Sequence, residues 1–275
     1  MPRAFLALGL LSLAIILPCA SAGAVSLPAG PDPADPAERA VSPPRGHQQV
    51  WASGHGFDTC AAPSLRAMRA WRNAYSIANI YIGGAARGCA QPHLTREWVV
   101  STRRMGYRLI PTYVGPQAPC TRFRHRFTGR HAFERGLEEA ERAVADAQRL
   151  GIPEGQPIYY DMEAYRSRDL SCRDAVLAFL DAWSIHLDEL GYLPGVYSSA
   201  ASGIRDLAEA EGITRPYAVW YARWDGEPEP YGDRHVPDDL WYDHQRIKQY
   251  RGGHFEEHGG VRMKVDSNIV DGPVY

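Results

Sequence analysis

The sequence predicts an α/β protein folded as a single closed (β/α)8 barrel, the TIM barrel, and three observations support that fold class. Short runs rich in β-branched and aromatic residues alternate with amphipathic stretches of helical period. Eight such runs over roughly 220 residues match the strand number and size of this barrel. No Gly-x-Gly-x-x-Gly sequence follows the first run and no Gly-Lys-Ser/Thr motif occurs, so a doubly wound open sheet is the weaker alternative.

Two segments precede the predicted barrel. Residues 1–22 have the features of a secretory signal peptide, because an apolar run follows Arg3 and Ala20-Ser21-Ala22 offers a cleavage site. The run is too short to span a bilayer comfortably, so no membrane span is expected after cleavage. Residues 23–50 are rich in Pro and Ala with few bulky apolar residues, which predicts a disordered linker. The barrel then occupies residues 51–275, and we expect a secreted, extracellular or cell-wall-associated protein.

The first four strands are each followed by a predicted helix. The strands are predicted at 54–58 (Gly-His-Gly-Phe-Asp), 77–82 (Ile-Ala-Asn-Ile-Tyr-Ile), 107–114 (Tyr-Arg-Leu-Ile-Pro-Thr-Tyr-Val) and 157–163 (Pro-Ile-Tyr-Tyr-Asp-Met-Glu). The helices are the amphipathic stretches at 63–73, 94–104, 131–150 and 173–190. This order of strand and helix is typical of a parallel sheet.

The second half continues the pattern. A strand at 193–197 (Leu-Pro-Gly-Val-Tyr) precedes a helix at 202–210, and a further strand is predicted at 217–222 (Tyr-Ala-Val-Trp-Tyr-Ala). The last two strands are predicted at 246–250 and 262–266. His254 and His258 between them satisfy a His-x-x-Glu-His zinc-protease pattern, but that motif requires a helix. Paired glycines on both sides make a helix improbable, so we interpret 254–258 as a loop and expect no metal site.

The cysteines predict two disulfides. Of five cysteines, Cys19 leaves with the signal peptide, and an even set remains for an oxidising compartment. We expect Cys60 to pair with Cys89 and Cys120 with Cys172, because each pair would lie in neighbouring loops at one end of the barrel. Free buried thiols are the alternative. The spacing does not suit a zinc clip.

Four carboxylates follow or end predicted strands, which is where active sites of such barrels lie. They are Asp58, Asp161, Glu163 and Asp266. The two-residue period of a strand places Asp161 and Glu163 on the barrel-facing side, and two acids so close should raise one pKa, as general acid catalysis requires. Taken singly, Asp58 could cap a helix, and Asp161 or Glu163 could pair with arginine.

Aromatic side chains also occur at or near the predicted strand ends, where sugar rings could stack on them; plain packing is the alternative for each. They are Tyr81, Tyr113, Tyr159, Tyr197, Trp220, Tyr221 and Trp224.

Several motifs resemble the glycoside-hydrolase-like domain family of exported bacterial proteins, which is similar in fold to the family 25 lysozymes. The matching sequences are Gly56-Phe-Asp-Thr-Cys60, Ala62-Pro-Ser64, Tyr81-Ile-Gly-Gly84, Leu109 to Cys120, Ile158 to Glu163, Gly195 to Ser199 and Gln249-Tyr250 before Gly252-Gly253. The resemblance covers about Ser53 to the C-terminus.

The resemblance implies roles for the site. Glu163 would be the general acid/base, and Asp161 would orient an N-acetyl group or stabilise an oxocarbenium-like centre. Asp58 and Asp266 would support them, and Gln249 would contact the substrate. It also implies a retaining route with substrate assistance, an exception to the standard two-carboxylate scheme.

The functional hypothesis is therefore an exported glycosidase acting on a cell-wall or extracellular polysaccharide such as peptidoglycan. The alternative is a non-catalytic glycan-binding module with the same cleft. A net charge of −2 gives no broad positive field, so nucleic acid is not expected as a partner. We expect no cofactor and a monomeric protein.

Overall fold

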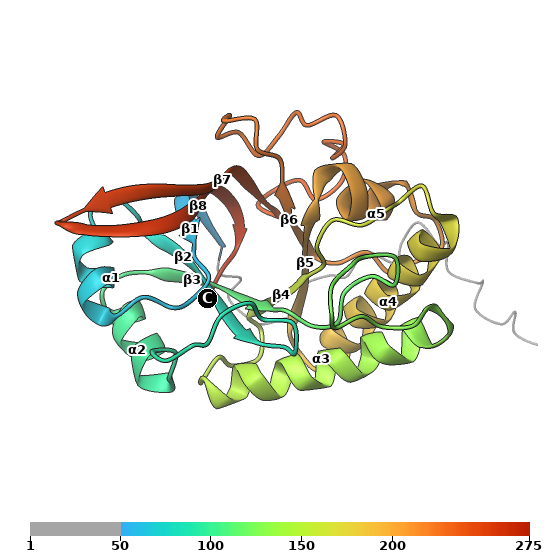
Figure 1. The fold of residues 1–275 in the computed structure, drawn as a ribbon, viewed down its shortest axis with the longest axis horizontal. Helices are drawn as coiled ribbons and strands as arrows, with labels where there is room; N and C mark the ends of the chain where they lie inside the picture. Colours follow the sequence, from blue (N-terminus) through green and yellow to red (C-terminus); the bar gives the residue numbers. More distant parts are fainter. Residues whose placement is uncertain (1–50) are drawn as a thin grey trace, which may run out of the picture. The chain divides into compact units, whose positions relative to one another are not determined.

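The computed structural model describes residues 51–275, which form a closed barrel of eight strands in sequential order (Figure 1). The predicted signal peptide and linker lie outside the described residues. The strands are β1 (Trp51–Asp58), β2 (Ile77–Gly83), β3 (Arg108–Tyr113), β4 (Pro157–Asp161), β5 (Leu193–Ser199), β6 (Ala218–Ala222), β7 (Arg246–His258) and β8 (Val261–Pro273). The predicted fold class and its eight strands are confirmed.

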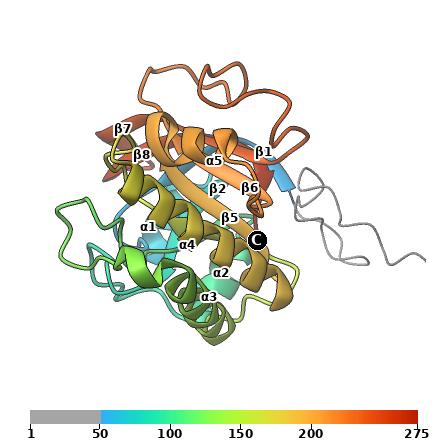
Figure 2. The same cartoon turned by 90° about the vertical axis from the view of Figure 1, so that its right-hand side faces the viewer.

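Helices cover the outside of the barrel (Figures 1 and 2). They are α1 (Leu65–Trp71), α2 (Arg96–Arg104), α3 (Ala132–Arg149), α4 (Leu170–Glu189) and α5 (Arg205–Glu209), with the short turns η2 (Gly129–His131) and η3 (Ala200–Ile204). Side chains of Ser64, Thr95 and Asp169 cap the first turns of α1, α2 and α4. Within residues 51–275, no helix is long and apolar enough to cross a membrane.

The regular alternation of strand and helix stops after β6, and the sequence likewise predicts no helix beyond the 217–222 strand. Residues 223–245 contain three prolines and two glycines, and they form turns instead of a helix. Strands β7 and β8 form a long antiparallel hairpin, and β8 also pairs antiparallel with β1. The eighth strand therefore runs against the other seven, and the hairpin projects from the barrel (Figure 1).

The predicted loop at 254–258 is wrong, because this segment is the second half of β7. Its residues alternate between partly buried and exposed, and they pair with β8 from His254↔Val265 to His258↔Val261. The glycines expected to end a regular element instead serve the hairpin: Gly259 and Gly260 form its turn, both with positive φ.

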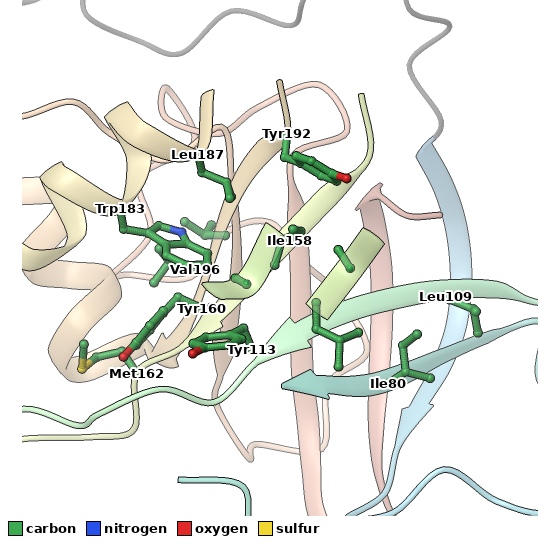
Figure 3. Close-up of a cluster of buried hydrophobic side chains, with 14 of the residues drawn as sticks. Ile80, Leu109, Tyr113, Ile158, Tyr160, Met162, Trp183, Leu187, Tyr192 and Val196 are labelled. Atoms are coloured by element: carbon green, nitrogen blue, oxygen red, sulfur yellow. The ribbon is translucent and has the colours of Figure 1, made fainter. Parts of the chain in front are cut away.

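Buried apolar residues form two clusters, and alternate side chains of β4 belong to different ones. Ile158, Tyr160 and Met162 belong to the cluster that packs against the helices, where Trp183 of α4 also lies (Figure 3). Tyr159 belongs to a second cluster built from the strands and their flanks, inside the barrel. This alternation directs the side chain of Asp161, two residues after Tyr159, to the barrel mouth.

Candidate active site

A cavity at the carboxyl ends of the parallel strands brings the four predicted carboxylates together. Asp58, Asp161, Glu163 and Asp266 line both lobes of this cavity. The first lobe extends towards the β2–α2 and β3–α3 loops, where Arg87 is part of its wall. The second extends towards the β6–β7 loop and the hairpin.

Asp58, the last residue of β1, is almost fully buried. The side-chain amides of Gln249 and Asn268 donate to its Oδ2 at 3.0 and 2.7 Å. Burial, followed by the nearby charge of Asp266, raises the pKa of Asp58 to about 8. Ser64, not Asp58, caps α1. Asp58 therefore holds a proton near neutral pH, anchored by amide groups from the two hairpin strands.

Asp161 ends β4, and Glu163 lies two residues beyond it. Burial raises the pKa of Asp161 well above its ordinary value, and the charges of Glu163 and Asp58 add to this effect. Burial also raises the pKa of Glu163, against a hydrogen bond from the Ala164 backbone that lowers it. The Oδ1 atom of Asp161 is buried without a hydrogen-bond partner in the described part of the chain. A buried acceptor left unpaired is costly, so the Asp161 carboxylate has unused hydrogen-bonding capacity next to the cavity that this residue lines.

Asp266 lines the cavity as predicted, but its position within its strand differs from the prediction. It lies within β8, not at its end, and pairs with Asp58 across the antiparallel β1–β8 ladder. Because β8 runs in the opposite direction, its first half lies at the barrel mouth. The backbone N–H of Gly253 in β7 donates to the carboxylate of Asp266.

Gln117 is a buried residue of the site that was not predicted from the sequence. Its side-chain N–H donates to the carbonyl oxygen of Asp161 at 2.7 Å, and its Oε1 accepts from the backbone N–H of Glu163 at 2.8 Å. One amide thus fixes the backbone on both sides of Met162. The available sequence signal for Gln117 was its position as a polar residue within the 109–120 motif.

The predicted stacking residues divide into two groups. Tyr81, Tyr197, Trp224 and Gln249 line the cavity. The remaining four do not line it and are buried. Tyr113 donates to Glu139 on α3, Tyr159 to the carbonyl of Pro273, Trp220 to Asn268 and Tyr221 to the carbonyl of Pro230.

Trp224 is the most exposed of the lining aromatics, with 67% of its surface accessible. Its indole N–H donates to Oε1 of Gln249 at 2.9 Å, and its ring lies so close to Gly252 that a Cβ there would clash. The ring is therefore held with one face free beside the carboxylates.

Two disulfides join Cys60 with Cys89 and Cys120 with Cys172, the pairings predicted from the barrel geometry. The first links the β1–α1 and β2–α2 loops, and the second links the β3–α3 loop to the start of α4. Cys60 itself lines both lobes of the cavity. The disulfides thus tie together the loops that form the cavity walls.

The two histidines of the His-x-x-Glu-His pattern form hydrogen bonds with a carboxylate. His254 and His258 contact Glu256 between them, at 2.7 and 3.0 Å, and Tyr75 also donates to it. These hydrogen bonds outweigh burial and lower the pKa of Glu256 to about 2. Within residues 51–275, no group of three or more metal-ligating side chains has a geometry that could hold a metal ion.

The buried Asp58 predicts a stability that falls as the pH rises. Its pKa is about 4 in the unfolded chain and about 8 in the folded one, so the folded state binds more protons across this window. The contribution is complete below pH ~4 and is lost as the pH passes about 8. We expect the melting temperature of Asp58→Asn to fall less between pH 5 and pH 9 than that of the wild type, measured by thermal unfolding. Asp174→Asn, at an exposed carboxylate, should behave as the wild type; parallel curves for Asp58→Asn and the wild type would contradict the assignment.

Comparisons with known proteins agree with this fold. An uncharacterized protein of B. stearothermophilus superposes with a TM-score of 0.55 at 21% identity, over 79% of this chain and 95% of that one. The modular autolysin LytC from Streptococcus pneumoniae gives 0.52 at 14% identity, over 79% of this chain and 46% of LytC. A muramidase from Acremonium alcalophilum gives 0.50 at 16% identity, over 79% and 93%. None of the curated proteins compared with the chain matches it.

At these identities the likeness shows a shared fold only. The sequence itself carries the stronger result, because the family model of the Rv2525c-like, glycoside hydrolase-like domain matches residues 69–270, which include three of the four cavity carboxylates. The chain therefore belongs to the Rv2525c-like, glycoside hydrolase-like domain family.

Proposed function

We propose that this chain is an exported glycoside hydrolase that cleaves a cell-wall or extracellular polysaccharide, with residues 1–22 as signal peptide, 23–50 as linker and 51–275 as catalytic barrel. The observation that carries the proposal is the convergence of four carboxylates in one cavity, with raised pKa values for Asp58, Asp161 and Glu163. Perturbed carboxylates in a cleft are typical of general acid catalysis.

Glu163 is the proposed proton donor. It is partly buried at the cavity wall, and its raised pKa keeps more of it protonated near neutral pH. In the first step it would protonate the leaving glycosidic oxygen as the anomeric bond breaks. In the second step the resulting carboxylate would accept a proton from the attacking water, which restores the acid.

Asp161 is the proposed partner of a substrate N-acetyl group. Its carboxylate, which lines the cavity, would accept the N–H of that group and hold the acetyl oxygen against the anomeric carbon. The acetyl oxygen would form the new bond as the leaving group departs, and water would then open the intermediate. This route retains the anomeric configuration. Asp58 and Asp266 would support the site, and Gln117 would fix the backbone of both reacting carboxylates.

Peptidoglycan is the first substrate to test. LytC, similar in fold, was also solved with a synthetic peptidoglycan ligand. The test is the release of new reducing ends by the wild-type protein from purified peptidoglycan, chitin oligosaccharides and other glycans. Release from at least one is expected. Binding of a glycan without any release would instead support the non-catalytic binding module.

Trp224 should contribute to glycan affinity. Its free ring face and fixed position suit stacking on a sugar, and we expect Trp224→Ala to weaken binding roughly tenfold, about 1.4 kcal/mol. Trp51→Ala is the matched control, because this tryptophan is 45% exposed at the other end of β1. Titration calorimetry with a glycan that the wild type binds measures the dissociation constants of both variants. Equal affinity of Trp224→Ala and the wild type would contradict a role for Trp224 in glycan binding.

A further inference from the structure

A strongly basic segment borders the first lobe of the cavity. Residues 118–131, here named the basic loop, lead from β3 into α3 and read Ala-Pro-Cys-Thr-Arg-Phe-Arg-His-Arg-Phe-Thr-Gly-Arg-His (the green segment before α3 in Figure 1). They include four arginines and no Asp or Glu, in a chain whose net charge is −2. The positive charge is therefore local to this wall.

Three arginines on this side of the barrel have no acidic partner in the described part of the chain: Arg87, which lines the first lobe, and Arg122 and Arg124, which flank the lining residue Phe123 along the chain. Arg122 and Arg124 are exposed and form no ion pair with any residue in 51–275, and the same holds for Arg87 on the neighbouring β2–α2 loop. On the adjoining helix α3 the pattern differs, because Arg135 and Arg142 both pair with glutamates. Exposed charges without acidic partners are available to an anionic ligand.

The backbone of the basic loop is held in place. Phe127 is buried and stacks on Phe179 of α4 at 4.6 Å, and Cys120 is joined to Cys172. The backbone N–H of Gln117 donates to the carbonyl of His125 at 2.8 Å, and that of Phe127 donates to the carbonyl of Gln117 at 3.1 Å. A fixed loop loses less conformational entropy when it binds a ligand.

The loop is also joined to the carboxylate site. Phe123, 44% exposed, lines the first lobe together with Arg87, Asp161 and Glu163. Gln117, on which the loop folds back, holds the backbone of Asp161 and Glu163. A glycan leaving the carboxylates on this side would meet the Phe123 ring and Arg87, next to the loop that carries Arg122 and Arg124.

We propose that this lobe is a subsite for an acidic polysaccharide, in which Arg87, Arg122 and Arg124 bind carboxylates carried by the sugars and Phe123 contacts a sugar ring. Guanidinium groups match the planar geometry of a carboxylate. The proposal deepens the proposed function and rests on it, since it names the substrate class of the same cavity.

The test compares two oligosaccharides with the same backbone. Chitohexaose is a neutral β-1,4 chain of N-acetylglucosamine; the second probe, a hexasaccharide alternating N-acetylglucosamine and N-acetylmuramic acid, adds a lactyl carboxylate to every second sugar. Calorimetry on the exported chain carrying Glu163→Gln, which prevents turnover, should give about tenfold tighter binding of the acidic probe at low salt. In ~0.5 M NaCl the preference should shrink to about twofold or less.

Two double variants that lose the same charge test whether the preference for the acidic probe comes from the basic loop. Arg122→Gln/Arg124→Gln should remove most of it and leave the affinity for chitohexaose unchanged. Arg104→Gln/Arg108→Gln removes the same charge at the opposite end of the barrel, where both side chains are exposed, and should keep the preference.

Three results would overturn the subsite: equal affinities for the two probes, no binding of either, or a preference that survives loss of Arg122 and Arg124. Tighter binding of phosphatidylglycerol vesicles or of a single-stranded oligonucleotide through the same arginines would also overturn it, in favour of a membrane or nucleic-acid surface. The proposed function fails separately, if the wild type releases no reducing ends even though the acidic probe is preferred.

Discussion

Replacing Glu163 with glutamine is expected to lower the rate of glycan hydrolysis by ~10²–10⁴-fold, the usual contribution of a general acid. Glutamine keeps the shape of the side chain but has no titrating proton to give to the leaving oxygen. The dissociation constant of the glycan should change by less than about threefold, because the lost interaction belongs to the transition state. Steady-state rates and calorimetric affinities, measured on the same glycan, separate these two effects.

A matched control is Glu154→Gln, an exposed glutamate in the loop before β4 and therefore at the far end of that strand from the cavity. It should keep wild-type rates. If Glu163→Gln retained more than about a tenth of the rate, another group would have to supply the proton. Loss of glycan binding together with the rate would point to a binding role for Glu163.

Removing the disulfide between Cys120 and Cys172 should cause the largest loss of stability. The two cysteines are separated by 52 residues, and closing a loop of that size restricts the unfolded chain by about 4 kcal/mol. We expect Cys120→Ser/Cys172→Ser to lower the free energy of unfolding by that order and the melting temperature by roughly 8–16 °C. Denaturant unfolding of the variant and the wild type under oxidising conditions measures the difference.

The Cys60→Ser/Cys89→Ser variant is the companion experiment, with a separation of 29 residues and a slightly smaller expected loss. A change below about 1 kcal/mol for the 120–172 pair would mean that the β3–α3 loop stays in place without its disulfide. Activity should fall along with stability, because that loop folds back on Gln117, which fixes the backbone of Asp161 and Glu163.

Local sequence pattern was sufficient to predict the barrel but not the direction of its last strand. Strands are recognised by runs of apolar residues, and an antiparallel strand such as β8 has the same pattern as a parallel one. The polar, alternating second half of β7 has few apolar residues, and its pairing with β8 depends on contacts between strands. The sequence predicts no helix after residue 222, and this was the available signal that the last two strands are joined as a hairpin.

The carboxylates were easier to predict than the residues around them. Asp58 and Asp161 each follow a buried run, which places them at the mouth of any barrel of this kind. Tyr113 shares its strand face with Leu109, which packs towards the helices, so parity within β3 could have excluded it. Strand parity could not identify Gln117, because its role depends on a loop that folds back across β4; its place within the 109–120 motif was a weaker signal.

The central claim is that this cavity adds water to a glycosidic bond, and the most direct measurement is digestion of purified peptidoglycan by the wild-type protein in ¹⁸O-labelled water. Mass spectrometry of the soluble fragments should show one ¹⁸O at each newly formed reducing end, in fragments that Glu163→Gln does not release. Anhydro-sugar ends, unlabelled ends, or the same labelled fragments from Glu163→Gln would contradict hydrolysis by this site.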